Sequence, residues 1–411
     1  MDDAGTRPED PFVAPPGCAL AAVRVSLTNF RSYVRAELHV EARPVVLAGA
    51  NGAGKTNLLE ALSLLSPGRG LRGAKLAAVQ RKAPSEASAA TGDVFTDSLW
   101  AVSATIARTP DGVWELGTGL LPAAGQAAAR RALHLNGAPA ESADLAELLP
   151  MLWLTPAMDR LFLEGASERR RFLDRLVFAL DPAHAKRAAR YERAMHERLR
   201  LLRDGVRDRA WLDGVEQTMA EAGAALTQAR LLVIDRLNAE LRARGAQGAF
   251  PCAHLALHDA LEESATDMSC LQSVFMASRE RDAETGRTGA GPHLADLEVR
   301  HTLKRADARD CSTGEQKALL ISIVLANAWQ QKKRHDGIAP VLLLDEIAAH
   351  LDAARRAALF EEILALQSQA WLTGTDSGLF APLKDRAAFF AIEGGRFVQS
   401  ERPHAGGIAV G

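Results

Sequence analysis

The chain has 411 residues, of which 47% are hydrophobic, and this is enough for two or three domains with buried cores. Its formal net charge of −2 excludes the strongly basic composition of many nucleic-acid-binding domains, so any DNA contact would come from a local patch. Four separated cysteines without a C-x-x-C pair argue against a zinc ribbon or a disulfide framework, and no run of 18 apolar residues could span a membrane, so we expect a cytoplasmic protein.

Two antiparallel strands are predicted near the amino terminus. Residues 1–21 are acidic and rich in proline and lack the apolar core of a signal peptide, so we expect a disordered extension there. Alternating hydrophobic residues over 22–40 then predict a pair of strands, with Arg31 and Ser32 at the turn. These two residues could contact a nucleotide held by the loop that follows, or they could form an ordinary exposed turn.

The segment 44–66, PVVLAGANGAGKTNLLEALSLLS, predicts a strand, a glycine-rich loop and a helix, and it matches the P-loop pattern G-x-x-x-x-G-K-[ST]. Glycines let several backbone N–H groups face one anion, and the positive end of the helix points at the same anion. We expect Lys55 to reach the β- and γ-phosphates of a nucleotide and the Thr56 hydroxyl to bind Mg²⁺. The predicted nucleotide-binding residues of this segment are Gly49, Ala50, Asn51, Gly52, Ala53, Gly54, Lys55, Thr56 and Asn57.

A basic segment and several strands are predicted next. Residues 61–84 contain no acidic side chain, and their positive charges are Arg69, Arg72, Lys75, Arg81 and Lys82. The segment could contact phosphates or could be a solvated surface. Short alternating stretches between 93 and 136 predict antiparallel strands, and residues 151–154 predict a buried strand.

Residues 165–285 are predicted to form a helical lobe inserted into an α/β domain. Its part 165–210 contains 13 Lys and Arg against 7 Asp and Glu, a net charge of +6, and this basic face could bind DNA or could be solvated. From Leu212 to Val233 hydrophobic residues recur at spacings of three and four, which predicts an antiparallel helical hairpin with a structural seam. Within the lobe, residues 273–281 are predicted to be helical. The two halves of the interrupted domain and a disordered tail are predicted at 22–164, 286–400 and 401–411.

Two further motifs lie in the carboxyl-terminal part. Residues 310–328, DCSTGEQKALLISIVLANA, predict a polar turn that caps an apolar helix. Residues 341–346, VLLLDE, predict a buried parallel strand that ends in two carboxylates, at the edge where open α/β sheets bind ligands. We expect Asp345 to hold Mg²⁺ through water and Glu346 to act as a general base on an attacking water. With the P-loop, these residues supply the phosphate site, the metal ligand and the base that phosphoryl transfer needs.

The motifs, in this order around a helical insertion, resemble the ABC-type ATPase head of the SMC/Rad50/RecF superfamily, and within it the RecF family. The resemblance covers about residues 23–396, and it implies an α/β P-loop ATPase head with a mixed sheet core, an antiparallel β subdomain and an inserted helical lobe. The segments that carry it are LTNFRSY at 27–33, GANGAGKTNLLEALSLLSPGRGLR at 49–72, ERRRFLDRLV at 168–177, GPH at 291–293, STGEQKALL at 312–320 and LLLDEIAAHLD at 342–352.

The resemblance implies an ATP-dependent DNA-binding protein of recombinational repair, replication and the SOS response. Such a protein would act on single- and double-stranded DNA at gap junctions and would help to load RecA with RecO and RecR. ATP would drive a homodimer with two nucleotides sandwiched between the subunits, and a weak, DNA-stimulated ATPase would serve DNA binding and release. Ser312 and Gly314 would contact the γ-phosphate held by the other subunit, with Gln316 and Lys317 in support, and Asp352 would lie on a loop at the interface.

Three positions depart from the family's pattern or cannot be matched to it. Leu294 stands where the family often has an arginine after GPH, Thr375 or Asp376 stands where a switch histidine is expected, and Asp159 is the candidate for the glutamine-loop position. The sequence also leaves three other functions open. A transporter subunit is disfavoured by the basic helical insertion, and an SMC-like scaffold by the short heptad run. A non-catalytic, ATP-gated clamp stays possible because an intact Glu346 permits hydrolysis without proving its role.

Overall fold

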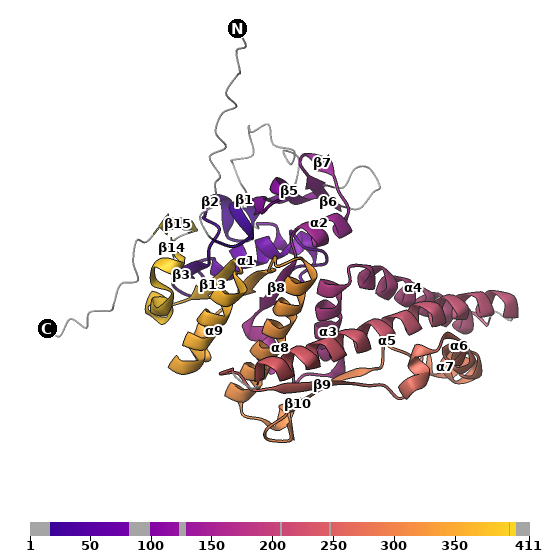
Figure 1. Cartoon of the computed structure of the whole chain (residues 1–411). Helices are drawn as coiled ribbons and strands as arrows, with labels where there is room; N and C mark the ends of the chain where they lie inside the picture. Colours follow the sequence, from indigo (N-terminus) through magenta and orange to yellow (C-terminus); the bar gives the residue numbers. More distant parts are fainter. Residues whose placement is uncertain are drawn as a thin grey trace, which may run out of the picture.

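The computed structural model describes residues 17–81, 99–122, 129–205, 208–245, 248–393 and 395–399. The first 16 residues of the expected extension, Lys82 and the expected tail lie outside the described residues. Two sheets with a helix between them form the upper part of the molecule in Figure 1, and long helices extend from its lower part to one side. The strand predicted before the P-loop and the strand predicted to end in Asp345 and Glu346 both belong to the sheet nearer the helices.

The central sheet is mixed, and its strands come from both halves of the sequence. Its order is β15-β14-β3-β13-β12-β8, with every neighbouring pair parallel except β14 and β15. The predicted P-loop strand β3 therefore lies between two strands, β13 and β14, that come more than 300 residues later in the sequence. The bounds are β3 Val45–Ala48, β8 Met151–Leu154, β12 Val341–Leu344, β13 Ala370–Gly374, β14 Ala388–Glu393 and β15 Arg396–Gln399.

The second sheet is antiparallel and has the order β2-β1-β4-β5-β6-β7. Helices α1 (Lys55–Ser63) and α2 (Ser142–Leu148) contribute buried leucines to the core that this sheet shares with the central sheet. Trp100 is fully buried there, and its indole N–H donates to the Leu76 carbonyl at 2.8 Å. The bounds are β1 Leu20–Phe30, β2 Tyr33–His39, β4 Trp100–Arg108, β5 Gly112–Leu121, β6 Arg130–Leu135 and β7 Ala138–Pro139.

The central sheet has a hydrophobic core on each face because its strands alternate. Val341 and Leu343 of β12 pack toward the antiparallel sheet, whereas Leu342 and Leu344 pack toward the helices. This explains why the sequence shows an unbroken apolar run at this strand. The helices on the second face include α3 Ala166–Leu180, α5 Arg209–Gly245, α8 Thr313–Arg334 and α9 Ala353–Leu366.

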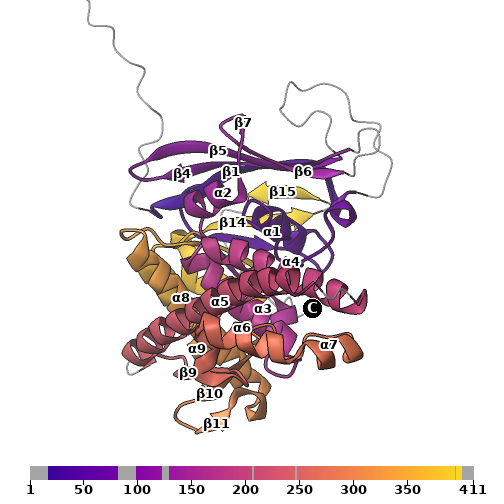
Figure 2. The same ribbon diagram turned by 90° about the vertical axis from the view of Figure 1, so that its right-hand side faces the viewer.

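The predicted helical hairpin is confirmed: α4 (Ala183–Arg203) runs beside α5 and is joined to it by a short connection. Figure 2 shows this pair crossing in front of α3, with α6 and α7 beside it. The helical segment predicted over 273–281 is confirmed, and it consists of the end of α6 (Met268–Ala277) and the start of α7 (Arg279–Thr285), which meet at Ser278. The Phe275 carbonyl accepts a hydrogen bond from the buried Arg198 guanidinium at 2.7 Å, and the helix is interrupted just beyond it.

A small sheet links the inserted segment to the part of the chain that follows it. Strand β9 (Ala253–His258) pairs with β10 (Asp296–His301), which pairs with β11 (Ala306–Asp307). This pairing crosses the boundary predicted at residues 285 and 286, so the lobe and the second half of the domain share a sheet.

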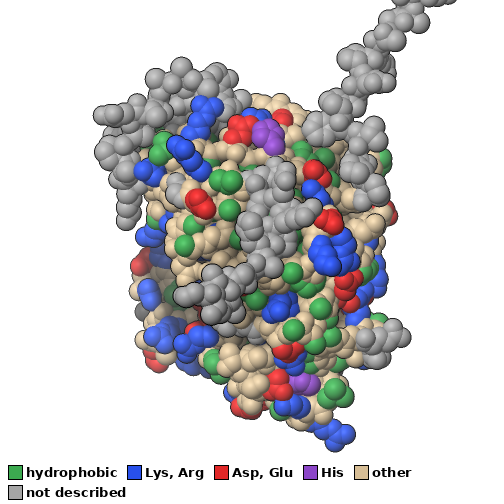
Figure 3. Space-filling view, turned by 90° about the vertical axis from the view of Figure 1, so that its left-hand side faces the viewer, with side chains coloured by type: hydrophobic (Ala, Val, Ile, Leu, Met, Phe, Trp, Pro, Cys, Tyr) green, Lys and Arg blue, Asp and Glu red, His purple; other side chains and the backbone are tan. Residues whose placement is uncertain are grey.

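The surface carries both signs of charge. On the face seen in Figure 3, basic and acidic side chains lie interspersed, as expected from the near-zero net charge. All four cysteines are free thiols, in agreement with the lack of a disulfide framework. Among the residues described above, no helix has both the length and the apolar character needed to cross a bilayer.

Candidate nucleotide-binding site

The loop between β3 and α1 has the backbone of an anion cradle. Gly52 and Gly54 have φ angles of 82° and 114°, in the region that side chains rarely adopt. A Cβ atom on Gly54 would lie 2.7 Å from the Tyr33 hydroxyl, and one on Gly49 would lie 2.7 Å from the Ile392 carbonyl oxygen. Glycine at positions 49 and 54 is therefore required by the close approach of neighbouring strands.

Lys55 lies along this loop with only 4% of its surface exposed. Its ammonium group donates hydrogen bonds to the carbonyl oxygens of Gly49 at 2.5 Å and Ala50 at 2.9 Å. Burial lowers the pKa of Lys55, while the nearby carboxylates of Glu346 and Asp345 act in the opposite direction. The amine is thus held at the point where the loop and the two predicted carboxylates converge.

Thr56, Asp345 and Thr373 form a hydrogen-bonded group at the carboxyl ends of the central strands. The Thr56 hydroxyl lies 2.9 Å and 3.0 Å from the two oxygens of Asp345, and the Thr373 hydroxyl donates to Asp345 at 2.7 Å. Thr373 also accepts a hydrogen bond from the backbone N–H of Glu346 at 2.8 Å. Glu346 has a φ of 49°, and this left-handed turn directs the chain away from the strand immediately after Asp345.

Thr373 is a site residue that sequence reasoning missed. The positions proposed in place of a switch histidine were Thr375 and Asp376, but Thr375 is exposed and Asp376 caps the next helical turn by accepting from Gly378 N–H. Leu344 and Leu372 are partners in the parallel register of β12 and β13, so the residues that follow them, Asp345 and Thr373, come side by side. The strand-end position of Thr373 was the available signal.

Arg31 and Ser32 lie against the start of α1. The Arg31 guanidinium forms a bidentate pair with the buried carboxylate of Glu60, at 2.6 Å and 2.9 Å. Ser32 Oγ accepts a hydrogen bond from the Asn57 side chain at 2.9 Å. The turn is therefore anchored to the P-loop helix, and contact of either residue with a nucleotide stays a prediction.

The basic segment after α1 folds back on the site. Arg72 donates to Asn57 and Glu60, each at 3.0 Å, and Arg81 donates to the Ser32 carbonyl at 2.7 Å. A cleft of about 850 Å³ opens beside these residues, within the size range of small-molecule sites. Its walls include Thr56, Asp345 and Glu346 on one side and Arg69, Arg72 and Arg171 elsewhere.

The polar turn before α8 has a surface part and a buried part. Ser312 and Gly314 are exposed, and Ser312 caps α8 by donating from its N–H and its hydroxyl to Glu315 at 3.1 Å and 2.9 Å. Gln316 is buried and donates to the Cys311 carbonyl at 2.9 Å. Among the described residues, no hydrogen bond or ion pair joins Ser312 or Gly314 to the P-loop. The exposed pair is thus presented outward from its own subunit.

Three other predicted positions have defined partners or exposure. Asp159, on the turn after β8, accepts an ion pair from the buried Lys317 at 3.2 Å, so it links the strand-end region to α8. Asp352 caps α9 by accepting from the Arg355 N–H at 2.8 Å. Leu294, in place of the family arginine, is 52% exposed.

The oxygen ligands suit Mg²⁺ bound together with a nucleotide. Within the described part of the chain, no cluster of three or more His, Cys, Asp and Glu side chains could hold a metal by itself. Thr56 and Asp345 supply one hydroxyl and one carboxylate side by side. Mg²⁺ commonly takes one or two protein ligands and completes its shell with waters and phosphate oxygens. The donor set present here fits that mode.

Comparison with known proteins assigns the family. The RecF/RecN/SMC N terminal domain model matches residues 22–386. The DNA replication and repair protein RecF of Agrobacterium fabrum is 48% identical over 379 residues, covering 90% of this chain and 96% of the relative. The chain belongs to the RecF family. The RecF protein of Caulobacter vibrioides is 47% identical over 379 residues, covering 89% of this chain and 95% of its own length.

Solved structures confirm the predicted ABC-type head. A structure of the recombination mediator protein RecF-ATPrS in the RecFOR pathway matches with a TM-score of 0.76 at 19% identity, covering 93% of this chain and 99% of the other. The Smc head domain from Pyrococcus furiosus, with an extended coiled coil and bound to the C-terminal domain of ScpA, matches with a TM-score of 0.50 at 17% identity, covering 93% and 96%. At such low identities these matches show the fold, and the RecF family of this chain rests on the sequence relatives.

Proposed function

We propose that this RecF-family chain is a cytoplasmic, ATP-dependent DNA-binding protein of recombinational repair and replication. It binds single- and double-stranded DNA at gaps as an ATP-gated homodimer and helps RecO and RecR to load RecA. The observation that carries the ATP-dependent part is the joined group of Thr56, Asp345, Thr373 and Glu346 beside the P-loop. The DNA-repair part rests on relatives that are 47–48% identical over nearly the whole chain.

The proposed ATPase uses the site residues in separate roles. The P-loop N–H groups and Lys55 bind the phosphates, and Thr56 and Asp345 hold Mg²⁺. Bound Mg²⁺ offsets charge on the β- and γ-phosphate oxygens. Glu346 accepts a proton from the attacking water while the oxygen of that water bonds to the γ-phosphorus. The bond from that phosphorus to the β–γ bridging oxygen breaks, which yields ADP and phosphate.

Gating by ATP requires that the nucleotide contact two subunits, because a ligand shifts an equilibrium only through its different affinity for the two states. The outward-facing Ser312 and Gly314 supply such a contact to the γ-phosphate of a second copy. The buried Lys317–Asp159 pair connects this helix end to the strand-end region of its own subunit. Arg31, Ser32 and Asn57 would contact the nucleotide on the side of the β1–β2 turn.

Sedimentation velocity of Glu346→Gln tests this function. The substitution removes the base but keeps the metal site, so the closed state should accumulate. With ATP and Mg²⁺ we expect Glu346→Gln to sediment as a dimer that holds a gapped duplex more tightly than the wild type does. The matched control is Glu361→Gln, which removes an exposed carboxylate paired with Arg386 on the surface. A Glu346→Gln protein that remains monomeric with both ligands would exclude the ATP-gated dimer and favour a partner-dependent scaffold.

A further inference from the structure

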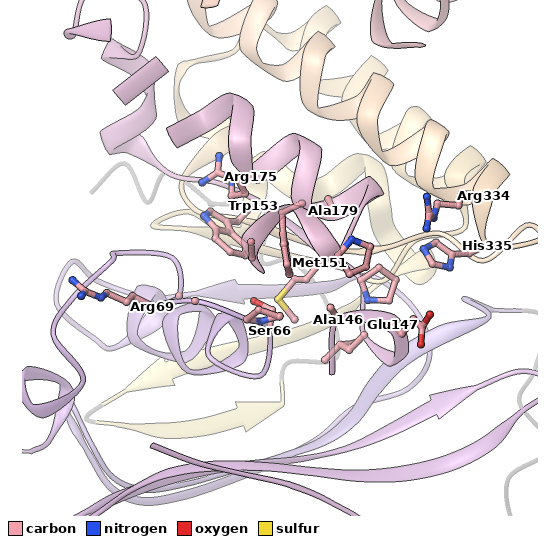
Figure 4. A pocket seen from close by; sticks show the side chains of 18 residues that line it. Ser66, Arg69, Ala146, Glu147, Met151, Trp153, Arg175, Ala179, Arg334 and His335 are labelled. Atoms are coloured by element: carbon pink, nitrogen blue, oxygen red, sulfur yellow. The ribbon is translucent and has the colours of Figure 1, made fainter. Parts of the chain in front are cut away.

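A second cavity adjoins the nucleotide cleft. It has a volume of about 280 Å³ and lies between α3 and the segment that follows α1. Figure 4 shows Arg175, Trp153 and Arg69 toward one end and Arg334 and His335 toward the other. The two cavities share four wall residues, Arg69, Gly70, Trp153 and Arg175. These four residues therefore form the boundary at which the two cavities adjoin.

Arg175 has no counter-charge among the described residues. Its guanidinium lies over the rings of Trp153 and Phe172, 5.0 Å and 5.5 Å from their centroids. Its one hydrogen bond is donated to the Met158 sulfur at 3.4 Å, and its buried Nε–H has no acceptor. Burial lowers the pKa of Arg175 to about 10, so the group is still a cation at neutral pH. A cation in such surroundings is stabilised by an anion that accepts its free N–H groups.

Trp153 adds a second unused donor at the same place. The residue is 8% exposed, and its buried indole N–H has no acceptor among the described residues. Buried polar groups are nearly always hydrogen-bonded, so each of these two donors would be stabilised by an acceptor placed beside it. Met151 and Ala179 are among the apolar wall residues, and the far end carries Arg334 and His335 together with the carboxylate of Glu147.

We propose that Arg175 and Trp153 form an anion-binding subsite for the phosphate ion released from ATP, and that the cavity beyond them is its way out of the subunit. This inference rests on the proposed ATPase. In a sandwich dimer the γ-phosphate is covered by the partner subunit, so an internal route would release phosphate before the dimer opens. The cavity volume of about 280 Å³ has room for a phosphate ion, and the nucleotide's own phosphates belong to the P-loop.

Phosphate binding can be measured without hydrolysis. The non-hydrolysable analogue AMPPNP fills the P-loop, and ³¹P NMR line broadening then reports inorganic phosphate bound elsewhere. We expect broadening with the wild-type protein and at least a tenfold weaker affinity in Arg175→Met, which retains the stacked aliphatic stem. Trp153→Phe keeps the ring but loses the N–H, and should weaken binding to a smaller extent. The control is Arg386→Met, since Arg386 is exposed, is already paired with Glu361 and is not a wall residue of either cavity.

Release is tested in a single-turnover experiment. Chemical quench measures the cleavage of ATP, and a fluorescent phosphate sensor measures free phosphate. We expect Arg175→Met to cleave ATP within about twofold of the wild-type rate but to release phosphate several-fold more slowly. Phosphate broadening that is absent in the wild type, or equal in Arg175→Met, would overturn the subsite, and unchanged release would overturn the route. Failure of the proposed function is distinct, since it would appear as no AMPPNP binding or no cleavage in the wild type.

Discussion

The Thr56 hydroxyl lies 2.9 Å and 3.0 Å from the two carboxylate oxygens of Asp345, although 289 positions separate these residues in the chain. The contact joins the first turn of α1 to the end of β12, and Thr373 at the end of β13 holds the same carboxylate. Since all three side chains are supplied by buried elements, this hydrogen-bonded group is organised by the fold itself.

Replacing Thr373 by valine should impair ATP hydrolysis. The change keeps the shape of the side chain but leaves the Glu346 N–H without its acceptor and removes one of the two hydroxyl groups that bind Asp345, the other being that of Thr56. Loss of a hydrogen bond to a charged group costs about 1.5–3 kcal/mol, so we expect kcat to fall roughly tenfold or more. Steady-state ATPase assays with saturating Mg²⁺ measure this. The exposed neighbour variant Thr375→Val should behave as the wild type, and equal losses in both variants would contradict the role of Thr373.

Alanine at Gly54 should harm nucleotide binding more than alanine at Gly52. Both positions have left-handed φ angles, but the new Cβ at residue 54 would meet the Tyr33 hydroxyl at 2.7 Å, whereas at residue 52 no atom lies within 4 Å. Gly52→Ala should therefore weaken ATP binding only by the conformational cost of about 1–2 kcal/mol. Gly54→Ala should abolish measurable binding. Titration of a fluorescent ATP analogue against both variants distinguishes them. Similar affinities would show that the Tyr33 side chain moves away from the new Cβ atom at little cost.

Arg198 should be essential for the stability of the helical lobe. It is fully buried and pairs with Glu216 at 2.8 Å and Asp282 at 2.7 Å, and neither carboxylate is exposed. Arg198→Met would leave both carboxylates buried and without this partner, at a cost of about 3–5 kcal/mol. We expect a clear fall in the midpoint of thermal unfolding measured by circular dichroism. Arg193→Met, at an exposed position on the same helix, is the control and should leave the midpoint unchanged.

Asp174 should contribute stability that is lost only in strong acid. Burial alone would raise its pKa, but hydrogen bonds from His184 and Arg230 outweigh burial and lower the pKa to about 2. A carboxyl whose pKa is lower in the folded state stabilises the protein above its unfolded pKa, near 3.8, and loses that effect as the pH falls toward 2.

Asp174→Asn should therefore lower the unfolding free energy by about 2 kcal/mol at pH 7 and pH 5, with a smaller difference below pH 3.8. Urea unfolding followed by fluorescence at several pH values measures the difference. A gap between the two proteins that widens as the pH falls would contradict the assignment of Asp174 as the stabilising carboxylate.

Local patterns were sufficient to predict most elements and the main motifs. Three features could be predicted from short segments, because each depends on residues within about one turn or one strand. They are the P-loop, the strand that ends in Asp345 and Glu346, and the capped start of α8. The boundary between α6 and α7 was not predicted, because no glycine or proline marks it, and the side chain that hydrogen-bonds Ser278 there is Arg198, 80 residues earlier in the chain. Thr373 was not predicted as a site residue, because its partner Asp345 follows a different strand.

The sequence by itself determined the family, the ATPase head and the chemical types of the site residues, because these depend on short motifs and alternating hydrophobicity. Only the tertiary structure decided which side chains meet. The order of the central strands brings Thr56, Asp345 and Thr373 together, and the packing of α3 places Arg175 against Trp153 at the edge of the cleft. Such contacts depend on strand register and helix packing between distant segments, and neither quantity is encoded in the spacing of neighbouring residues.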